Sequence, residues 1–455
     1  MVKSFDLIVV GSGSGLEVSS QAADGGLSVA VIESGPFGGT CLNRGCIPSK
    51  MLIHSADVAE IIRQSELFGI TTEVTAINWD FIIRRASETV DADARMIEEG
   101  NREQARISVF KDSARFVGHK TLEVGSERIT AEQIVIAAGS RPRIPKIEGL
   151  ESVPYITSDE ALRLPKQPRR LAILGAGFIA AELAHFFGAL GTEVTIVHRG
   201  PRMLRAEDED VAQRFTEVYE RRFRLLLNTT VRRVRQQRGE MVLDVVVGGR
   251  QESLVADALL LAVGRVPNAD TLEVTNAGVD VDERGFIPTD EYMETNVEGV
   301  WALGDIVGRY LLKHSANLEA AYVAHNMLNL EEKIAVDYHA MPHAIFASPQ
   351  VAAVGISEQD AREQGVKFVA ASYRYIDTAY GSSIEDKDGF VKVLVDPDSR
   401  QILGCHIIGT DASVLIQEVV NVMRMRAPAS MIGQSIYVHP ALPEVVQRAF
   451  TSLSV

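Results

Sequence analysis

The chain has 455 residues, 46% of them apolar and 24% charged, with a formal net charge of −15. This length exceeds what one hydrophobic core usually organises, so we expect a globular protein of about two to four domains. The negative charge argues against nucleic acid and anionic membrane surfaces as partners, and no apolar run reaches the roughly 18 residues that span a bilayer. The N-terminus lacks the pattern of a secretory signal peptide, which predicts a cytoplasmic protein.

The N-terminal segment predicts a strand, a glycine-rich turn, a helix and a second strand. An apolar run at 5–10 precedes Gly11-Ser12-Gly13-Ser14-Gly15, and a second apolar run ends before Glu33. Backbone amides of such a turn can approach a pyrophosphate, and a carboxylate after the second strand can bind ribose hydroxyls. Leu16 replaces the third glycine of the fingerprint, and a glycine-rich turn without a ligand remains the alternative interpretation.

Two of the three cysteines lie shortly after this segment, in the run Gly38-Gly39-Thr40-Cys41-Leu42-Asn43-Arg44-Gly45-Cys46-Ile47-Pro48-Ser49-Lys50. Cysteines at this spacing, at the start of a helix, can close a small ring, and the helix end stabilises a thiolate. So few cysteines favour a catalytic disulfide over a structural framework, and no metal site is predicted. The third cysteine, Cys405, lies in an apolar run and is predicted to be a buried core thiol.

A second strand, turn and helix pattern begins with the apolar run 171–174 and the turn Gly175-Ala176-Gly177, followed by a predicted helix. Ala180 fits the third position of the dinucleotide fingerprint. The chain therefore carries two predicted nucleotide-binding units.

Basic residues follow the second strand of this second unit, where NAD-binding proteins place an acid. Val197 is followed by His198 and Arg199, and Arg202 and Arg205 stand close behind. Arginines can hold the 2′-phosphate of NADP, so the sequence favours NADPH over NADH. A solvated basic turn remains the alternative interpretation of these arginines.

Further apolar strands are predicted before Gly139, before Gly264 and before Asp305. From about Asp337 the pattern changes to shorter alternating strands, such as 389–395, mixed with helices. This change predicts a third, α+β module.

Near the C-terminus, His439 is followed five residues later by Glu444. An acid can hold a histidine in one tautomer, and the histidine can then act as a general acid and base. A capped helix start is the structural alternative for this His-Pro pair. We favour the acid–base pair because a dithiol elsewhere in the chain needs a proton carrier.

Taken together and in order, these motifs resemble the class I flavoprotein pyridine nucleotide-disulfide oxidoreductase family over essentially the whole chain. The strongest resemblance within it is to the mycothione reductases, and the dihydrolipoamide dehydrogenases are near relatives. The segments that carry it are 131–142, 177–182, 311–317 and 439–446.

The resemblance implies an α/β fold with two Rossmann-like nucleotide-binding domains and an α+β C-terminal dimerisation domain. The expected domains are 1–149 for FAD, 150–270 for NAD(P), 271–336 as the segment completing the FAD domain, and 337–455 for dimerisation.

The resemblance also implies roles for individual residues. Cys46 would be the thiolate facing the flavin, and Cys41 the interchange thiol. Lys50 and Glu182 would form an ion pair near the flavin, and His439 with Glu444 would reach the active site of the other subunit of a homodimer. The implied FAD residues are Gly11, Gly13, Glu33, Gly39, Thr40, Lys50, Gly139, Asp305 and Ala316. The implied NADPH residues are Gly175, Gly177, Ile179, Glu182, Arg199, Arg205 and Gly264.

The expected activity is electron transfer from NADPH through FAD and a Cys41–Cys46 disulfide to a small disulfide substrate. The alternative is a dihydrolipoamide dehydrogenase acting with NAD on lipoyl groups of a carrier protein. The lack of a C-terminal cysteine pair disfavours mercuric reductase and the large thioredoxin reductases. Retention of both cysteines, His439 and Glu444 disfavours a non-catalytic flavoprotein subunit.

One residue departs from the family pattern. Arg44 stands between the cysteines, where these relatives have a small apolar residue. A cation there could favour a thiolate or contact an acidic substrate, and both hypotheses remain open.

Overall fold

The computed structural model describes residues 2–453, which form two compact units. Unit 1 contains residues 2–51, 81–143 and 264–338. Unit 2 contains residues 52–80, 144–263 and 339–453. The predicted domain boundaries also include residue 1 and residues 454–455, which lie outside the described residues.

Unit 1 is built on a seven-stranded sheet with the order β3-β2-β1-β6-β5-β4, and β16 pairs with β6. Strands β3, β2, β1, β6 and β16 are parallel, whereas β4, β5 and β6 pair antiparallel. The bounds are β1 (Val2–Val10), β2 (Val29–Ile32), β3 (Ile107–Phe110), β4 (Ala114–Gly118), β5 (Thr121–Val124), β6 (Glu127–Ile136) and β16 (Val300–Ala302). β7 (Ser140–Pro142) and β15 (Arg265–Pro267) form a separate antiparallel pair. Strand β2 is buried along its whole length because parallel strands of this kind are covered on both faces.

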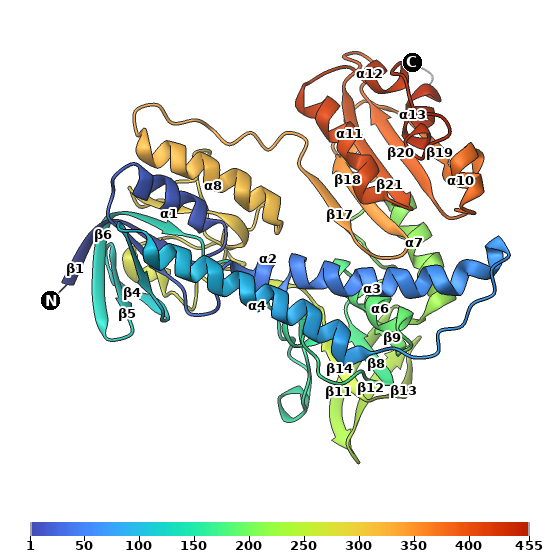
Figure 1. The fold of residues 1–455 in the computed structure, drawn as a ribbon, viewed down its shortest axis with the longest axis horizontal. Helices are drawn as coiled ribbons and strands as arrows, with labels where there is room; N and C mark the ends of the chain where they lie inside the picture. The colour runs from blue at the N-terminus through green and yellow to red at the C-terminus, as the bar shows by residue number, and fades with distance from the viewer. Residues whose placement is uncertain (1, 454–455) are drawn as a thin grey trace. The chain divides into compact units, whose positions relative to one another are not determined.

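Helices α1 (Gly15–Asp24) and α8 (Lys313–Leu328) lie side by side in unit 1 (Figure 1). They share an apolar core with β1 and β2, which includes Val18, Val323 and Trp301. After β2, the chain continues through the short helix α2 (Gly39–Arg44) into the longer helix α3 (Cys46–Gln64). The longer α4 (Trp79–Glu103) follows.

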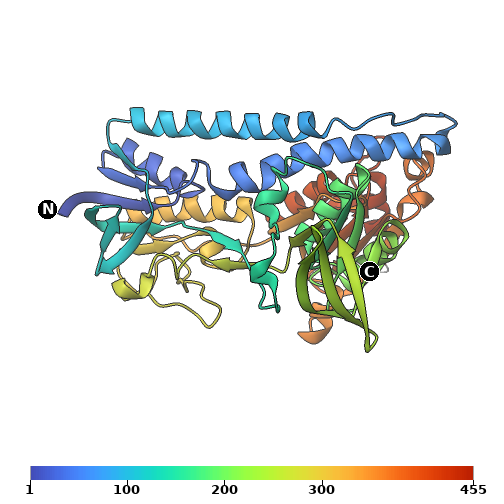
Figure 2. The same ribbon diagram turned by 90° about the horizontal axis from the view of Figure 1, so that it is seen from below.

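Unit 2 contains a four-stranded parallel sheet with the order β10-β9-β8-β14. Its strands are β8 (Arg170–Leu174), β9 (Glu193–Val197), β10 (Arg224–Leu226) and β14 (Ala258–Leu261). Its helices are α5 (Ser158–Ala161), α6 (Phe178–Ala189) and α7 (Glu209–Arg222). The antiparallel strands β11 (Thr229–Gln237), β12 (Glu240–Val247) and β13 (Arg250–Ala256) lie side by side in yellow-green (Figure 2).

The C-terminal part of unit 2 is a five-stranded antiparallel sheet with the order β17-β18-β21-β20-β19. Its strands are β17 (Pro342–Ile345), β18 (Gln350–Gly355), β19 (Val369–Arg374), β20 (Phe390–Val395) and β21 (Ile402–Gly409). Its helices are α9 (Glu358–Glu363), α10 (Ala379–Ser383), α11 (Ala412–Arg424), α12 (Ser430–Gly433) and α13 (Glu444–Thr451). Helices α11 and α13 pack on this sheet around a core that includes Val391, Ile407 and Val446 (Figure 1).

The predicted fold class is confirmed, because two mostly parallel sheets precede an antiparallel α+β module. Among the described residues, no helix is both long and apolar enough to cross a membrane. The same part of the chain contains no cluster of three or more His, Cys, Asp or Glu side chains able to hold a metal ion.

Candidate dithiol site and nucleotide-binding turns

The glycine-rich turn after β1 has the close packing that a phosphate-binding turn requires. Gly11 has a φ of 105°, and a Cβ there would overlap the carbonyl oxygen of Ala137. A Cβ on Gly39 would lie 2.7 Å from the Cα of Gly13. Only glycine fits these positions, so backbone amides are accessible at close range, as a bound pyrophosphate needs. The residues present therefore fit FAD.

The side chain of Glu33, directly after β2, is held by the glycine-rich turn and by the loop that follows Glu33. Its Oε2 accepts hydrogen bonds from the amide of Ser12 at 3.0 Å and the hydroxyl of Ser12 at 2.7 Å. Its Oε1 accepts from the amide of Gly35 at 2.7 Å. A carboxylate offers about four acceptor positions, so this arrangement fixes the side chain and still leaves capacity for a ribose hydroxyl.

Asp305 lies in a short 3₁₀ turn directly after β16, as predicted. Its Oδ2 accepts a hydrogen bond from the hydroxyl of Ser140 at 2.6 Å, and the Nε of Arg265 lies 3.7 Å from the same oxygen. Ser140 directly follows Gly139, whose φ is 65°. These contacts bring Gly139 and Asp305 together at the carboxyl ends of β6 and β16.

The two cysteines lie on neighbouring helices. Cys41 is inside α2, and Cys46 is the first residue of α3. Gly45 separates the helices, and a Cβ at Gly45 would lie 2.9 Å from the carbonyl oxygen of Thr40. The predicted helix start is therefore correct for Cys46, whereas Cys41 precedes the break.

A buried side chain that the sequence analysis missed holds this segment in place. The amide of Asn43 donates hydrogen bonds to the carbonyl oxygens of Phe37 at 2.8 Å and Gly39 at 3.0 Å. Asn43 thus ties α2 to the loop that precedes it. The sequence shows that Asn43 lies inside the cysteine motif, but it does not show which way the side chain points.

The two cysteines do not form a disulfide in this structure, and Cys41 is half-buried whereas Cys46 is exposed. The pKa of Cys41 is raised because its thiol hydrogen-bonds to Cys46 and because it is partly buried. The charge of Lys313 acts in the opposite direction and lowers the pKa of Cys41. A coupled pair of this kind can share one proton, which leaves one sulfur anionic.

Arg44 points toward the adenosine end of the predicted FAD site. Its Nη2 lies 3.5 Å from the position that a Cβ on Gly35 would occupy, and the Oε1 of Glu33 lies 3.3 Å from the same point. Neither hypothesis for Arg44, thiolate stabilisation or substrate docking, anticipated this neighbourhood.

The third cysteine is buried, as predicted. Cys405 lies on β21 with no exposed surface, and its pKa is raised by this burial. A buried neutral thiol of this kind is inert, so its surroundings suit packing rather than redox chemistry.

The second glycine turn has the same close packing. Gly175 has a φ of 124°, and a Cβ there would overlap the carbonyl oxygen of Ala262, two residues before Gly264. Gly177 is the residue before α6, and Ile179 lies in the first turn of that helix. The residues present therefore fit a dinucleotide as well.

The basic residues after β9 belong to a loop that folds back on this turn. The amide of Leu204 donates to the carbonyl oxygen of Ala176 at 2.8 Å. Arg199 and Arg205 are exposed, and neither forms a salt bridge within residues 2–453. Burial and the charges of these two arginines lower the pKa of His198. The loop therefore carries a positive potential next to the glycine turn.

A buried ion network anchors the far end of this loop. The Nζ of Lys392 on β20 lies 2.9 Å from Asp208, 2.6 Å from Asp210 and 2.8 Å from Glu358. Lys392 and Asp208 are almost fully buried. This network fixes the start of α7 and so the loop that carries Arg199 and Arg205.

Glu182 and Lys50 lie in different units, and their pairing remains a prediction. Glu182 is buried on α6, and its Oε1 accepts a hydrogen bond from the amide of Phe346 at 3.0 Å. Lys50 is half-buried on α3.

The predicted pair of His439 and Glu444 forms a direct contact. Nδ1 of His439 lies 2.9 Å from Oε1 of Glu444, and Oε2 accepts from the amide of Ala441 at 3.1 Å. Glu444 is the first residue of α13. Nearby, the hydroxyl of Tyr437 donates to Oε2 of Glu418 at 2.6 Å, which anchors the segment before His439.

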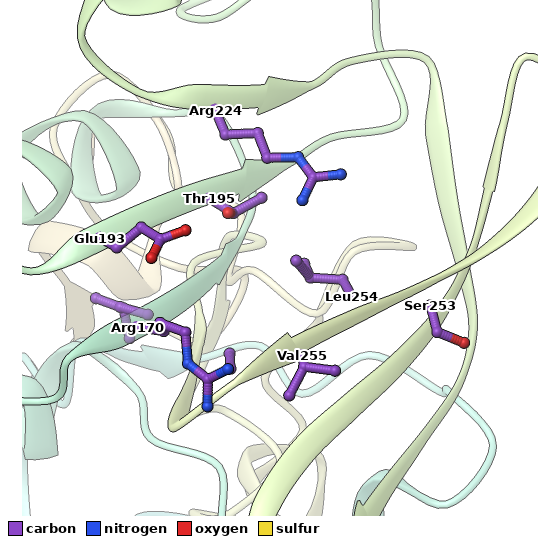
Figure 3. Close-up of a pocket in the computed structure, with 9 residues that line it drawn as sticks. Arg170, Glu193, Thr195, Arg224, Ser253, Leu254 and Val255 are labelled. Atoms are coloured by element: carbon purple, nitrogen blue, oxygen red, sulfur yellow. The ribbon is translucent and has the colours of Figure 1, made fainter.

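A small polar pocket lies at the opposite edge of the parallel sheet of unit 2. Arg170, Glu193 and Arg224, at the amino ends of β8, β9 and β10, line it together with Ser253 (Figure 3). Arg170 is already paired with Asp257 at 2.6 Å. The glycine turn follows the carboxyl end of β8, so this pocket is separate from the predicted dinucleotide site. Its volume of about 160 Å³ is also below the ~300 Å³ at which ligand pockets begin.

Comparison with known proteins covers almost the whole chain. Residues 5–327 match the pyridine nucleotide-disulphide oxidoreductase family, and residues 341–450 match the dimerisation domain of that family. The chain is 40% identical to a mycothione reductase of Mycobacterium tuberculosis, covering 99% of this chain and all of the relative. It is 34% identical to a dihydrolipoyl dehydrogenase of Chlamydia muridarum, covering 98% and 96%. The HOCl-induced flavoprotein disulfide reductase RclA from Escherichia coli has a similar structure, with a TM-score of 0.88 and 28% identity over 98% of this chain and 99% of that chain.

Proposed function

Because the chain belongs to the pyridine nucleotide-disulfide oxidoreductase family and is an NAD(P)H-dependent disulfide reductase, we propose that it reduces a small disulfide of the mycothione type. The hydrogen-bonded pair of Cys41 and Cys46 carries this proposal, since a dithiol at a helix start is the chemistry that a disulfide substrate needs. The mycothione reductase relative supports the substrate class.

Enzymes of this family use FAD and NAD(P)H, which supply the two electrons of the reaction when bound. We propose that this chain holds them with the residues that the sequence predicted. For FAD these are Gly11, Gly13, Glu33, Gly39, Thr40, Lys50, Gly139, Asp305 and Ala316. For NADPH they are Gly175, Gly177, Ile179, Glu182, Arg199, Arg205 and Gly264. The exposed positive charges of Arg199 and Arg205 support NADPH over NADH.

In the proposed reaction, two electrons and one proton convert the Cys41–Cys46 disulfide into one thiol and one thiolate. The thiolate of Cys41 attacks one sulfur of the substrate, which forms a mixed disulfide and releases the other half as a thiolate. Cys46 then attacks the sulfur of Cys41, which restores the intramolecular disulfide and releases the second thiol. Each turnover thus consumes one disulfide, two electrons and two protons.

His439 is the proposed proton carrier. A carboxylate can only accept a hydrogen bond, so Glu444 directs the proton of the imidazole to Nδ1 and leaves Nε2 to exchange protons with the leaving thiolate. By the family resemblance, His439 of each subunit serves the dithiol of the other subunit. The match to a dimerisation domain supports this homodimer.

We further propose that residues 1–149 and 271–336 form the FAD-binding domain, residues 150–270 the NAD(P)-binding domain, and residues 337–455 the dimerisation domain. A reducing compartment suits an enzyme whose cysteines must return to thiols, and we therefore place the protein in the cytoplasm.

Steady-state assays with mycothiol disulfide, lipoamide and glutathione disulfide, each with NADPH and with NADH, test the proposed function. The proposal predicts the highest kcat/KM for mycothiol disulfide with NADPH. A higher kcat/KM for lipoamide with the NAD couple would instead identify a dihydrolipoamide dehydrogenase.

A further inference from the structure

Lys313, the first residue of α8, hydrogen-bonds to the first glycine turn, and this turn packs on the segment that carries Cys41. From this placement we infer that Lys313 is a positioning residue that stabilises the anionic form of Cys41 for its attack on the substrate disulfide. The inference rests on the proposed function in one respect, namely that Cys41 is the attacking sulfur. No motif in the sequence analysis assigned a role to Lys313.

The position of Lys313 is fixed by hydrogen bonds to the first glycine turn. Its Nζ donates to the hydroxyl of Ser14 at 2.8 Å, and that hydroxyl donates to Oδ1 of Asn317 at 2.9 Å. Asn317 lies one helical turn after Lys313 on α8. The ammonium group is therefore held at the junction of α1 and α8, which lie side by side (Figure 1).

The same turn packs directly on the helix that carries Cys41. A Cβ on Gly39 would lie 2.7 Å from the Cα of Gly13, and the amide of Gly38 donates to the carbonyl oxygen of Ser12 at 3.1 Å. Gly13 neighbours Ser14, and Gly39 precedes Cys41 by two residues in α2. The turn that contains Ser12, Gly13 and Ser14 thus connects the ammonium group of Lys313 to the start of the cysteine motif.

The electrostatics agree with this geometry. The hydrogen bond between the side chains of Cys41 and Cys46 and the partial burial of Cys41 both raise the pKa of Cys41. The positive charge of Lys313 opposes them. An attacking sulfur must be anionic, so a cation that lowers the pKa of Cys41 against these effects favours its nucleophilic form.

Other titratable groups lie on the short helix α2 and in the first turns of α1, α3 and α8. They are Glu17 on α1, Arg44 on α2, Cys46 and Lys50 on α3, and His314 on α8. The guanidinium of Arg44 lies near Gly35, and the carboxylate of Glu33 lies near the same glycine. The charge of Lys313 thus acts on the sulfur of Cys41, although Arg44 is closer in sequence.

The proton balance of the step is simple. When Cys41 ionises, its proton passes to His439 or to solvent, and Lys313 remains protonated throughout. The Cys41 sulfur then forms a bond to one substrate sulfur while the substrate disulfide breaks. Lys313 gains and loses no bond, so its removal changes the pH at which Cys41 reacts and leaves the products the same.

Alkylation of the reduced holoenzyme with iodoacetamide tests the inference without any disulfide substrate. The rate at Cys41 is followed from pH 6 to pH 10 by mass spectrometry of the peptides that contain each cysteine. In Lys313→Met we expect the reaction midpoint of Cys41 to move up by about one pH unit, which corresponds to a roughly tenfold slower reaction near pH 7.5. Lys313→Arg keeps the charge and should keep the midpoint near that of the wild type.

Two comparisons separate an electrostatic effect from a structural one. Arg44→Gln removes a cation three residues from Cys41 and is expected to leave the midpoint of Cys41 in place. Cys405 is buried and should stay unalkylated in every variant, which confirms that the fold is intact. An unchanged midpoint in Lys313→Met, or an equal shift in Arg44→Gln, contradicts the inference.

The result is independent of the substrate. If the steady-state assays fail for mycothiol disulfide but the alkylation midpoint shifts, the proposed substrate is wrong and the role of Lys313 stands. If mycothiol disulfide is reduced and the midpoint does not move, the proposed function stands and the role of Lys313 is wrong.

Discussion

Nδ1 of His439 lies 2.9 Å from Oε1 of Glu444, and the hydrogen bond from His439 is the main reason that the pKa of Glu444 is lowered. The second oxygen of Glu444 accepts from the amide of Ala441, which fixes the carboxylate at the start of α13. The imidazole is therefore oriented by a carboxylate that stays ionised at neutral pH. This arrangement suits a histidine that donates and accepts a proton at Nε2.

Replacement of His439 tests this role. We expect His439→Ala to slow disulfide turnover by about 10²-fold or more, because a general acid–base group is lost. Flavin reduction by NADPH should stay nearly unchanged, since that half-reaction does not need the proton carrier. Stopped-flow absorbance of flavin reduction, compared with steady-state turnover, measures both. Equal slowing of the two half-reactions contradicts the assignment.

The nucleotide preference depends on the loop after β9. Arg199→Ala is expected to lower kcat/KM for NADPH by roughly ten- to a hundredfold, because a charged hydrogen bond to phosphate contributes about 1.5–3 kcal/mol. The kcat/KM for NADH should change little. Arg202→Ala is the matched control, since Arg202 is paired with Glu209 at 2.6 Å. A wild-type enzyme that uses NADH better than NADPH would refute the proposed preference.

The buried ion network of Lys392 predicts a large loss of stability. Lys392→Met leaves the buried carboxylate of Asp208 without its cation, and breaking a buried pair costs about 3–5 kcal/mol. Urea unfolding measures the change in the free energy of unfolding. Lys387→Met is the control, because Lys387 and its partner Glu385 are exposed and such pairs contribute about 1 kcal/mol or less. A similar loss in both variants would show that burial of the pair is unimportant.

The pair of His343 and Glu207 predicts a pH-dependent contribution to stability. Burial disfavours the charged imidazole, but the hydrogen bond and charge of Glu207 outweigh it, so the pKa of His343 is raised. A raised pKa stabilises the folded state below the unfolded value near 6.5, and this stabilisation is lost as pH rises through the folded value. His343→Gln should therefore destabilise the protein more at pH 6 than at pH 9, as measured by urea midpoints. In a Glu207→Gln background this pH dependence should disappear.

The elements of the two nucleotide-binding units could be predicted from the sequence because their signals are local. The run before Gly11 ends in four apolar residues that are buried in β1, and Gly175 and Gly177 follow β8 directly, as the predicted strand and turn required. The contact between His439 and Glu444 was also predicted, because the two residues are only five positions apart in the sequence. Burial of Cys405 followed from its apolar neighbours.

Contacts across long sequence separations could not be predicted in this way. Lys313 reaches Ser14, which lies about 300 positions earlier, and no local pattern encodes that meeting. Arg44 lies near Gly35, and the spacing of residues in the cysteine motif does not reveal this contact. The network around Lys392 likewise joins a β-strand to the start of α7. These contacts are set by tertiary packing rather than by spacing.

Trapping of a mixed disulfide tests the central claim most directly. In Cys46→Ser the thiol of Cys41 can attack mycothiol disulfide, but no second cysteine resolves the adduct. The account predicts one mycothiol attached to the peptide that contains Cys41 and one mycothiol released, both measured by mass spectrometry. Cys41→Ser should form its adduct at Cys46 far more slowly. An adduct that forms as fast on Cys46, or no adduct with mycothiol disulfide in either variant, would contradict the account.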